Sequence, residues 1–308
     1  MVSESVVSGQ HFPHMLRDSA RAAGNIACMG LDPVVEALPE SYRFHGINGA
    51  ISFFAEIFDR MVRERLCPAA FKLNAGFFVQ HDTPRVGAFS GSHTLAALIE
   101  LVREMFPGVP VILDSKRGDI ERSSANYARE GFLVWDADAV TVSPYMGRDS
   151  VQPFLQQGGL KRGVYVVAHT PNPGARVLQD LIVEFGGERL PLSHAVAHEI
   201  VQWSLTTPCL GAVVGATPTV TLGSICRIFA KTSVFVLIPG VGAQGGDPGE
   251  VMAQLRGSGV DVELARVSSS SDLTHCWHNA GYSAPHDYSQ VCVDRLRALI
   301  SHLKVSTT

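Results

Sequence analysis

The chain lacks the sequence features that mark membrane proteins, secreted proteins and nucleic-acid-binding proteins. No apolar run approaches the roughly 18 residues that a helix needs to cross a bilayer. The N-terminal segment lacks the basic-then-apolar order of a secretory signal. No stretch is rich in lysine or arginine, and the formal net charge is −4. We therefore expect a cytoplasmic protein whose partners include neither a membrane nor a nucleic acid.

Cysteine pairs are also missing, because the six cysteines are scattered without a C-x-x-C motif. In a chain of 308 residues this scatter favours reduced, buried thiols over a framework of disulfides. Charged residues make up only 18% of the chain and hydrophobic residues 46%, which is the composition of a well-buried globular protein. No composition break marks a second domain, so we expect one domain over residues 1–308 with its core at about 25–303.

Short apolar runs alternate with longer stretches of helical pattern along the chain. We predict eight strands, at residues 25–32, 69–74, 110–116, 139–145, 163–170, 210–217, 233–242 and 260–268. Helices are predicted at residues 52–65, 93–105, 120–132, 193–205, 218–230 and 289–303. This alternation predicts an α/β fold, a single (β/α)8 TIM barrel, with an open doubly wound sheet as the alternative. The stretch 171–191 is long for a strand-to-helix loop and is expected to form a lid or a small surface insertion.

Charged side chains gather at the ends of two neighbouring predicted strands. Lys72 stands at the end of the second strand, and Asp114, Lys116 and Asp119 end or follow the third. Alternate residues of a strand share a face, so Asp114 and Lys116 should point the same way. A row of alternating charges keeps its lysines protonated and its acids ionised, and can hold a proton donor beside a carboxylate in a dry pocket. The replacement of CO₂ by a proton demands this arrangement; the alternative is an ion-pair network that only closes the barrel mouth.

A glycine-rich loop, "IPGVGAQGGDPGE" at residues 238–250, follows the seventh predicted strand. Glycine lets backbone N–H groups approach an anion closely, and barrels often bind phosphate in the loops after strands seven and eight. Gln244 would add a side-chain amide beside Gly245 and Gly246. The loop therefore predicts a phosphate site, although turns are also rich in glycine.

Five segments, in this order and spacing, resemble the orotidine 5′-phosphate decarboxylase family in its longer bacterial branch: "FKLNAGFF", "LDSKRGDI", "SPYMGRDSVQPF", "TPNPGA" and "PGVGAQGGD". The resemblance covers roughly residues 26 to 256. It implies a carboxy-lyase that converts orotidine 5′-phosphate into uridine 5′-phosphate in pyrimidine biosynthesis, with no metal and no organic cofactor. The D-x-K-x-x-D motif alone is shared with sugar-phosphate decarboxylase and aldolase relatives that use magnesium.

The resemblance also implies roles for the charged residues. Lys116 would protonate C6 of the pyrimidine after CO₂ leaves, and Asp114 would press against the substrate carboxylate. Asp32 and Lys72 would hold ribose hydroxyls, with Lys72 also a member of the charge row. Gln244 and the glycine loop would hold the phosphate.

A homodimer with shared active sites is implied as well. Asp119, with Ile120 and Ser123 just beyond it, would reach across the dimer interface into the partner's site. The remaining expected substrate ligands stand at strand tips: Asn74 after the second strand, and His169, Thr170 and Asn172 near the pyrimidine after the fifth.

The stretch after the eighth predicted strand departs from the family pattern. Family members carry an Asn/Ser-Ser-Arg segment there, whose arginine pairs with the phosphate, whereas "ARVSSSSDLTH" (265–275) places Ser271 at that position. The loss of a bidentate guanidinium is not a conservative change. Serine hydroxyls, backbone N–H groups or Arg266 would have to replace it. Pro171 is a second departure, because serine is more common there.

These departures leave two alternatives open beside ordinary orotidine 5′-phosphate decarboxylation. One is a related enzyme that acts on a modified or unphosphorylated pyrimidine nucleoside or nucleotide in a specialised pathway. The other is a catalytically silent nucleotide-binding protein. The intact charge row argues against the silent protein, because a pure binder has little use for a carboxylate that faces an anionic ligand.

Overall fold

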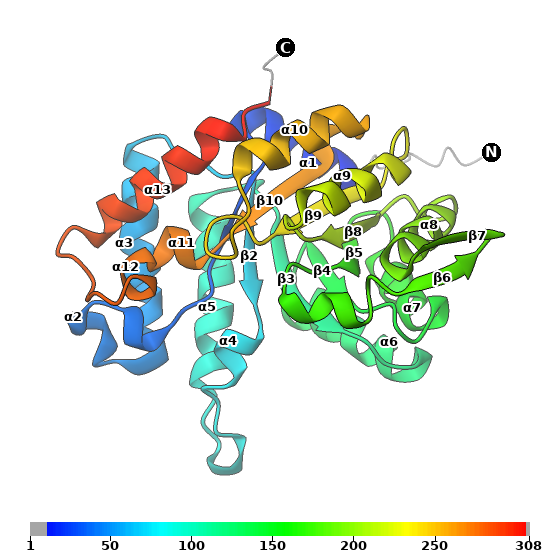
Figure 1. Cartoon of the computed structure of the whole chain (residues 1–308). Coiled ribbons are helices and arrows are strands. Elements are labelled where there is room, and N and C mark those ends of the chain that lie inside the picture. Colours follow the sequence, from blue (N-terminus) through cyan, green and yellow to red (C-terminus); the bar gives the residue numbers. More distant parts are fainter. Residues whose placement is uncertain (1–10, 306–308) are drawn as a thin grey trace, which may run out of the picture.

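The computed structural model describes residues 11–305, and its centre is a closed barrel of eight parallel strands (Figure 1). The strands are β1 (Ala27–Gly30), β2 (Ala70–Asn74), β3 (Val111–Arg117), β4 (Ala139–Val142), β5 (Gly163–His169), β8 (Leu210–Val214), β9 (Phe235–Pro239) and β10 (Ala265–Ser269). Their spatial order, β1-β10-β9-β8-β5-β4-β3-β2, closes the ring with each strand beside its neighbours in the barrel sequence. The predicted TIM barrel is thus confirmed, and the open sheet is excluded.

The strands are buried on both faces, which explains why the sequence shows continuous apolar runs instead of alternation. Every residue of β1, β4, β8 and β10 is buried. Seven of the eight strands start and end within three residues of the predicted limits. The eighth starts later than predicted because residues Val262–Leu264 form a 3-10 turn before β10.

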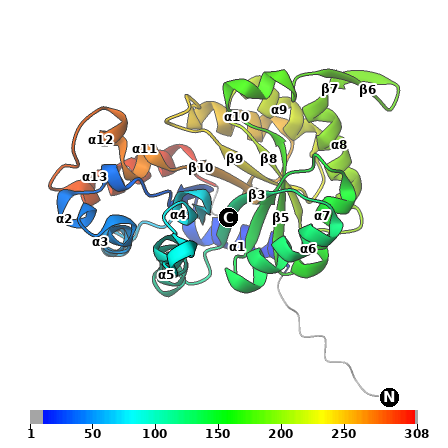
Figure 2. The ribbon, with the colours of Figure 1, turned by 90° about the horizontal axis from the view of Figure 1, so that it is seen from below.

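Helices surround the barrel (Figures 1 and 2). They are α1 (Phe12–Ala23), α2 (Glu40–Arg43), α3 (Gly49–Arg63), α4 (Gly76–Val79), α5 (Ser90–Met105), α6 (Glu121–Arg129), α7 (Arg148–Gly158), α8 (Leu192–Ser204), α9 (Thr219–Ile228), α10 (Pro248–Ser258), α11 (Ser271–Thr274), α12 (Cys276–Asn279) and α13 (Tyr288–His302). All six predicted helices are present. The longer helices α1, α7 and α10 were not predicted, although Asp247 caps α10 by accepting the Glu250 N–H and proline follows at the first position.

The stretch 171–191 divides into two parts. Its first part forms a 3-10 turn at Pro173–Val177, and its second part forms the antiparallel hairpin of β6 (Ile182–Phe185) and β7 (Glu188–Pro191). Gly186 and Gly187 make the hairpin turn with φ of 62° and 86°, which glycine adopts without a steric cost. The hairpin projects from the outside of the barrel beside α8 (Figure 2).

Helix α1 covers the amino ends of the barrel strands. The Phe12 ring packs edge-on against Tyr165 and Phe235, with ring centroids 6.4 and 5.1 Å away. Gly163 makes room for this ring, because a Cβ at that position would lie 2.2 Å from it. The barrel is therefore closed at its amino end and open at its carboxyl end.

Two further findings bear on the composition arguments. All six cysteines are free. None of the helices within residues 11–305 is long and apolar enough to span a membrane.

Candidate active site

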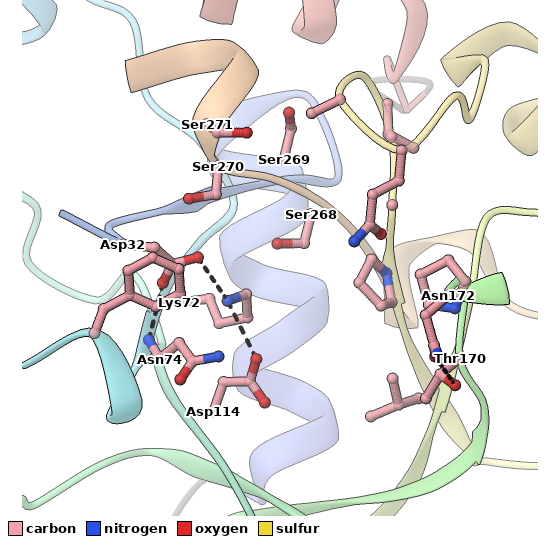
Figure 3. Close-up of a pocket in the computed structure, with 18 of the residues that line it drawn as sticks. Asp32, Lys72, Asn74, Asp114, Thr170, Asn172, Ser268, Ser269, Ser270 and Ser271 are labelled. Atoms are coloured by element: carbon pink, nitrogen blue, oxygen red, sulfur yellow. Dashed lines mark hydrogen bonds and ion pairs between the residues drawn. The ribbon is translucent and has the colours of Figure 1, made fainter. Parts of the chain in front are cut away.

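A cavity of about 460 Å³ opens at the carboxyl ends of the barrel strands, where barrels carry their chemistry (Figure 3). Figure 3 shows Asp32, Lys72, Asn74 and Asp114 grouped on one side and Thr170 and Asn172 on the other, with the serines of residues 268–271 between and above them. The predicted site residues that line the cavity are Asp32, Lys72, Asn74, Asp114, Lys116, Thr170, Asn172, Gln244 and Ser271.

A row of three ion pairs crosses one wall of the cavity. Lys72 Nζ lies 3.4 Å from Asp32 Oδ2 and 3.3 Å from Asp114 Oδ2. Lys116 Nζ lies 2.6 Å from Asp114 Oδ1. The row Asp32–Lys72–Asp114–Lys116 alternates in sign and sums to zero, so it is electrically balanced without a ligand.

The end of β3 is distorted in a way that brings Lys116 into the cavity. The register between β3 and β4 shifts between Leu113 and Arg117, and Lys116 has φ 44°, an uncommon value for a residue with a Cβ. The Thr141 hydroxyl accepts the Lys116 backbone N–H at 2.9 Å and donates to Asp114 Oδ1 at 2.8 Å. Thr141 was not predicted as a site residue, because its only signal in the sequence is a polar side chain inside an apolar strand.

The protonation states of this row follow from its contacts. Burial by itself raises the pKa of Asp114, but the ammonium groups of Lys72 and Lys116 and the Thr141 hydroxyl outweigh it and lower that pKa to about 2. Burial lowers the pKa of Lys72, and the carboxylates of Asp32 and Asp114 more than compensate, so it rises above the usual lysine value. Both groups are therefore charged at neutral pH.

The wall opposite the charge row is held by Gln179, a residue that the sequence analysis missed. Its side-chain Oε1 accepts the Thr170 N–H at 2.8 Å, and its Nε2 donates to Thr170 Oγ1 at 2.9 Å. The Thr170 hydroxyl lies 2.6 Å from Asn172 Oδ1 as well. This network fixes the two polar side chains that face Asp114 across the cavity.

Four consecutive serines, residues 268–271, form a hydroxyl-lined part of the cavity wall. The Ser270 hydroxyl is buried and has no hydrogen-bond partner within the described residues. Gly30 allows Ser270 to come this close, because a Cβ on Gly30 would lie 2.5 Å from the serine Cβ. His275 lines the same part, and burial lowers its pKa to about 4, so its imidazole is neutral at neutral pH. Of these residues only Ser271 was predicted by number, together with serine hydroxyls of this stretch in general.

The glycine-rich loop hydrogen-bonds mainly to itself. Gly242 N–H donates to the Gly246 carbonyl, Gly245 N–H to the Gly242 carbonyl, and Gly246 N–H to the Gly240 carbonyl. Gly240, Val241, Ala243 and Gln244 line the cavity, whereas Gly245 and Gly246 do not. The structure therefore does not bring the N–H groups of Gly245 and Gly246 to the place where the sequence analysis expected them.

Comparison with known proteins gives the family. The profile of the orotidine 5′-phosphate decarboxylase / HUMPS family matches residues 67–262, more than half of the chain. The chain belongs to this family. A relative from Aromatoleum aromaticum, named orotidine 5′-phosphate decarboxylase, is 39% identical over 240 residues, which cover 77% of this chain and 80% of the relative. Another so named, from Roseiflexus sp., is 36% identical over 267 residues, or 86% and 89% of the two chains.

Solved structures agree with this assignment. The structure of Leishmania donovani OMP decarboxylase matches with a TM-score of 0.67 and 29% sequence identity, and covers 95% of this chain and 100% of that chain. The family that the five motifs indicated is thus confirmed.

Asp119, which is predicted to reach into the site of a partner chain, lies outside the cavity of its own chain. Its Oδ1 accepts the N–H of Ile120 at 2.8 Å, and its side chain does not line the cavity. Ile120 is 63% exposed and Ser123 is half-buried on the first turn of α6, also outside the cavity. Within a single chain the row consists of Asp32, Lys72, Asp114 and Lys116. The contribution of Asp119 to a partner's site stays a prediction.

His169 lies behind the wall of the cavity. It is buried, its Nε2 is 3.5 Å from Asp180 Oδ1, and it lines a neighbouring cavity of about 430 Å³. Burial lowers its pKa despite the Asp180 carboxylate. The structure therefore does not place His169 among the groups that face the charge row.

The prediction that Arg266 contacts the substrate is wrong. Arg266 is fully buried at the closed end of the barrel, where its guanidinium donates to the carbonyls of Ala69 and Leu16, the hydroxyl of Ser19 and two carbonyls just before it in the chain. Burial lowers its pKa to about 10, which still leaves it charged at neutral pH. Arg266 is the second residue of β10, whereas this strand lines the cavity only from Ser268 onward.

Proposed function

We propose that this protein is a carboxy-lyase that replaces the C6 carboxylate of the pyrimidine in orotidine 5′-phosphate with a proton and so produces uridine 5′-phosphate. The observation that carries the proposal is the balanced row Asp32–Lys72–Asp114–Lys116 in a ligand-sized cavity at the barrel rim. The names of the relatives, 39% and 36% identical over most of the chain, support it.

In the proposed reaction the bond between C6 and the carboxylate breaks, and its electron pair stays on C6 as CO₂ leaves. The Lys116 ammonium stabilises this negative charge and then donates its proton to C6, and the resulting amine regains a proton from solvent. The Lys116 side chain is 42% exposed and reaches into the cavity, which supports its role as the donor. Lys72 would keep Asp114 ionised while Lys116 reacts.

Asp114 would stand against the substrate carboxylate. Two like charges about 4 Å apart repel by roughly 4 kcal/mol at an effective dielectric constant of about 20. Enzymes lower barriers by about 8–23 kcal/mol, so this repulsion supplies a minor share. Most of the acceleration would come from the fixed ammonium of Lys116 beside C6, because a preorganised charge costs no reorganisation when the carbanion forms.

The other cavity residues suit the remaining parts of the substrate. We assign the ribose hydroxyls to Asp32 and Lys72, which are buried beside each other. Thr170 and Asn172 would bind the polar edge of the pyrimidine from the wall opposite the charge row, with Asn74 beside that row. Gln244 and Ser271 would face the 5′ end.

We also propose that two copies of the chain form a dimer around Asp119, Ile120 and Ser123. The support is that Asp119 does not line the cavity of its own chain and that the neighbouring Ile120 is 63% exposed. Sedimentation of the purified protein at micromolar concentration should give twice the chain mass, and an Ile120→Asp variant should shift the equilibrium toward monomer. A wild-type monomer at these concentrations would contradict the dimer.

The activity is tested by following the ultraviolet absorbance of orotidine 5′-phosphate after addition of the protein. We expect the absorbance of the substrate to decay to that of the uridine product. The Lys116→Ala variant, purified in the same way, controls for a contaminating enzyme. Unchanged absorbance with both orotidine 5′-phosphate and orotidine would refute the proposed activity, and saturable nucleotide binding under those conditions would indicate the silent binding protein.

A further inference from the structure

The cavity has no unpaired positive charge to offer a phosphate. Within residues 11–305 its charged lining residues are Asp32, Asp114, Lys72 and Lys116, and each lysine is already within 3.4 Å of a carboxylate. The lining therefore carries no net charge. Orotidine 5′-phosphate would bring a carboxylate and a phosphate with nearly two negative charges into it, whereas orotidine would bring the carboxylate alone.

The serine side of the cavity, which residues 268–271 line, adds no cation either. Three N–H groups of the glycine loop donate to carbonyls of the same loop, and His275 is neutral. Helix α11 starts at Ser271 but has only four residues and carries Asp272 in its first turn, which opposes an anion. The nearby Arg295 is paired with Asp272 at 3.3 Å and does not line the cavity.

What this side does offer is hydroxyl groups. The four serines at 268–271 line it, and the buried Ser270 hydroxyl has no partner within the described residues. A buried hydroxyl without a partner is costly, and a ligand hydroxyl can satisfy it as donor or acceptor. A dianion in the same place would lose its hydration without gaining a cation.

We infer that the part of the cavity that receives the 5′ end of the substrate suits an uncharged, hydroxyl-bearing group at least as well as a phosphate, so that the protein decarboxylates orotidine-type nucleosides at least as efficiently as their 5′-phosphates. The inference rests on the proposed decarboxylation and narrows its substrate class. The serines that carry it are at the 5′ end, whereas the reaction takes place at Lys116.

The first test compares kcat/KM for orotidine and orotidine 5′-phosphate with the wild-type protein. We expect a ratio of one or more in favour of the nucleoside. A value of kcat/KM that is at least tenfold higher for the nucleotide would overturn the inference while leaving the decarboxylase function intact. Because turnover of either substrate establishes the decarboxylation, the two claims fail separately.

The second test restores a cation by Ser271→Arg, with Ser271→Gln as the matched control of similar length and no charge. A charged hydrogen bond is worth about 1.5–3 kcal/mol, so Ser271→Arg should shift the kcat/KM ratio toward the nucleotide by roughly tenfold to a hundredfold. Ser271→Gln should shift it by less than about threefold. Equal shifts in the two variants, or none in either, would show that charge at this position does not set the preference.

A binding measurement decides the inference even if neither compound is turned over. Calorimetric titration with uridine and with uridine 5′-phosphate compares the two 5′ ends without chemistry. We expect uridine to bind at least as tightly. Binding of uridine 5′-phosphate that is tenfold tighter or more would show a phosphate site that the serine side does not explain, and would overturn the inference.

Discussion

Replacement of Lys116 by alanine should lower kcat by a factor of at least about 10³ and leave the fold intact. The proton donor alone contributes about 10²–10⁴ in rate, and the same ammonium stabilises the carbanion. The side chain is 42% exposed, and its only ion pair within residues 11–305 is with Asp114, which keeps Lys72 as a partner. Steady-state kinetics of the variant measure kcat, and circular dichroism shows whether the fold is intact.

Lys231→Ala is the matched control for this substitution. Lys231 is an exposed lysine outside the cavity with φ 59°, close to the 44° of Lys116, so both replacements put alanine into the left-handed region. The control should keep the wild-type rate. A Lys116→Ala variant with more than a tenth of the wild-type kcat would rule out Lys116 as the proton donor.

Replacement of Lys72 by methionine should destabilise the protein by about 3 kcal/mol at neutral pH and abolish turnover. Lys72 is buried between Asp32 and Asp114, and the removal of one partner from a buried ion pair leaves uncompensated charge. Methionine keeps the length of the side chain, so the loss reports charge more than packing. Urea unfolding measures the change in the free energy of unfolding.

The cost of Lys72→Met should depend on pH. In the wild type the pKa of Asp114 is lowered to about 2 from an unfolded value near 3.9, so its ionised form stabilises the fold above about pH 4. This stabilisation is lost as the pH falls from about 4 toward 2. The variant lacks much of it at every pH, and its difference from wild type should therefore shrink below pH 4.

The double variant Lys72→Met/Asp32→Asn provides the control, because it removes one of the two buried carboxylates that the lysine pairs with, together with the lysine itself. We expect it to recover part of the lost stability. A single variant as stable as wild type at pH 7 would mean that the row is not an electrostatically coupled unit.

The barrel and one wall of its site were predictable because parallel strands place their carboxyl ends at one edge. That rule alone brings Lys72 and Asp114 together, and the alternation of β3 adds Lys116. The strand lengths were predictable because strands buried on both faces appear as apolar runs. No such rule applies beyond the strand ends, because the direction of a side chain there depends on the conformation of the loop.

The wrong placements of His169 and Arg266 came from features that the hydrogen-bonded pairing of the strands does not determine. The role of Asp119 stays a prediction, because this residue lies two residues after β3 in a loop and its predicted contacts are with a partner chain. His169 follows a register shift in β5 after Val167, and such a shift changes the face that a side chain occupies. Arg266 stands at the start of its strand, and only the packing of α1 shows why a cation is needed at that end.

The position of Arg266 also decides how short the chain can become. Its guanidinium is saturated only because α1 supplies the Leu16 carbonyl and the Ser19 hydroxyl. A truncated protein that began at residue 25, the limit expected for the core, would leave the charged Arg266 guanidinium without two of its hydrogen-bond partners in an apolar environment. It would also expose the rings of Tyr165 and Phe235, which Phe12 covers. Helix α1 is therefore required for the stability of the barrel, although it lies at the end of the barrel opposite the candidate active site.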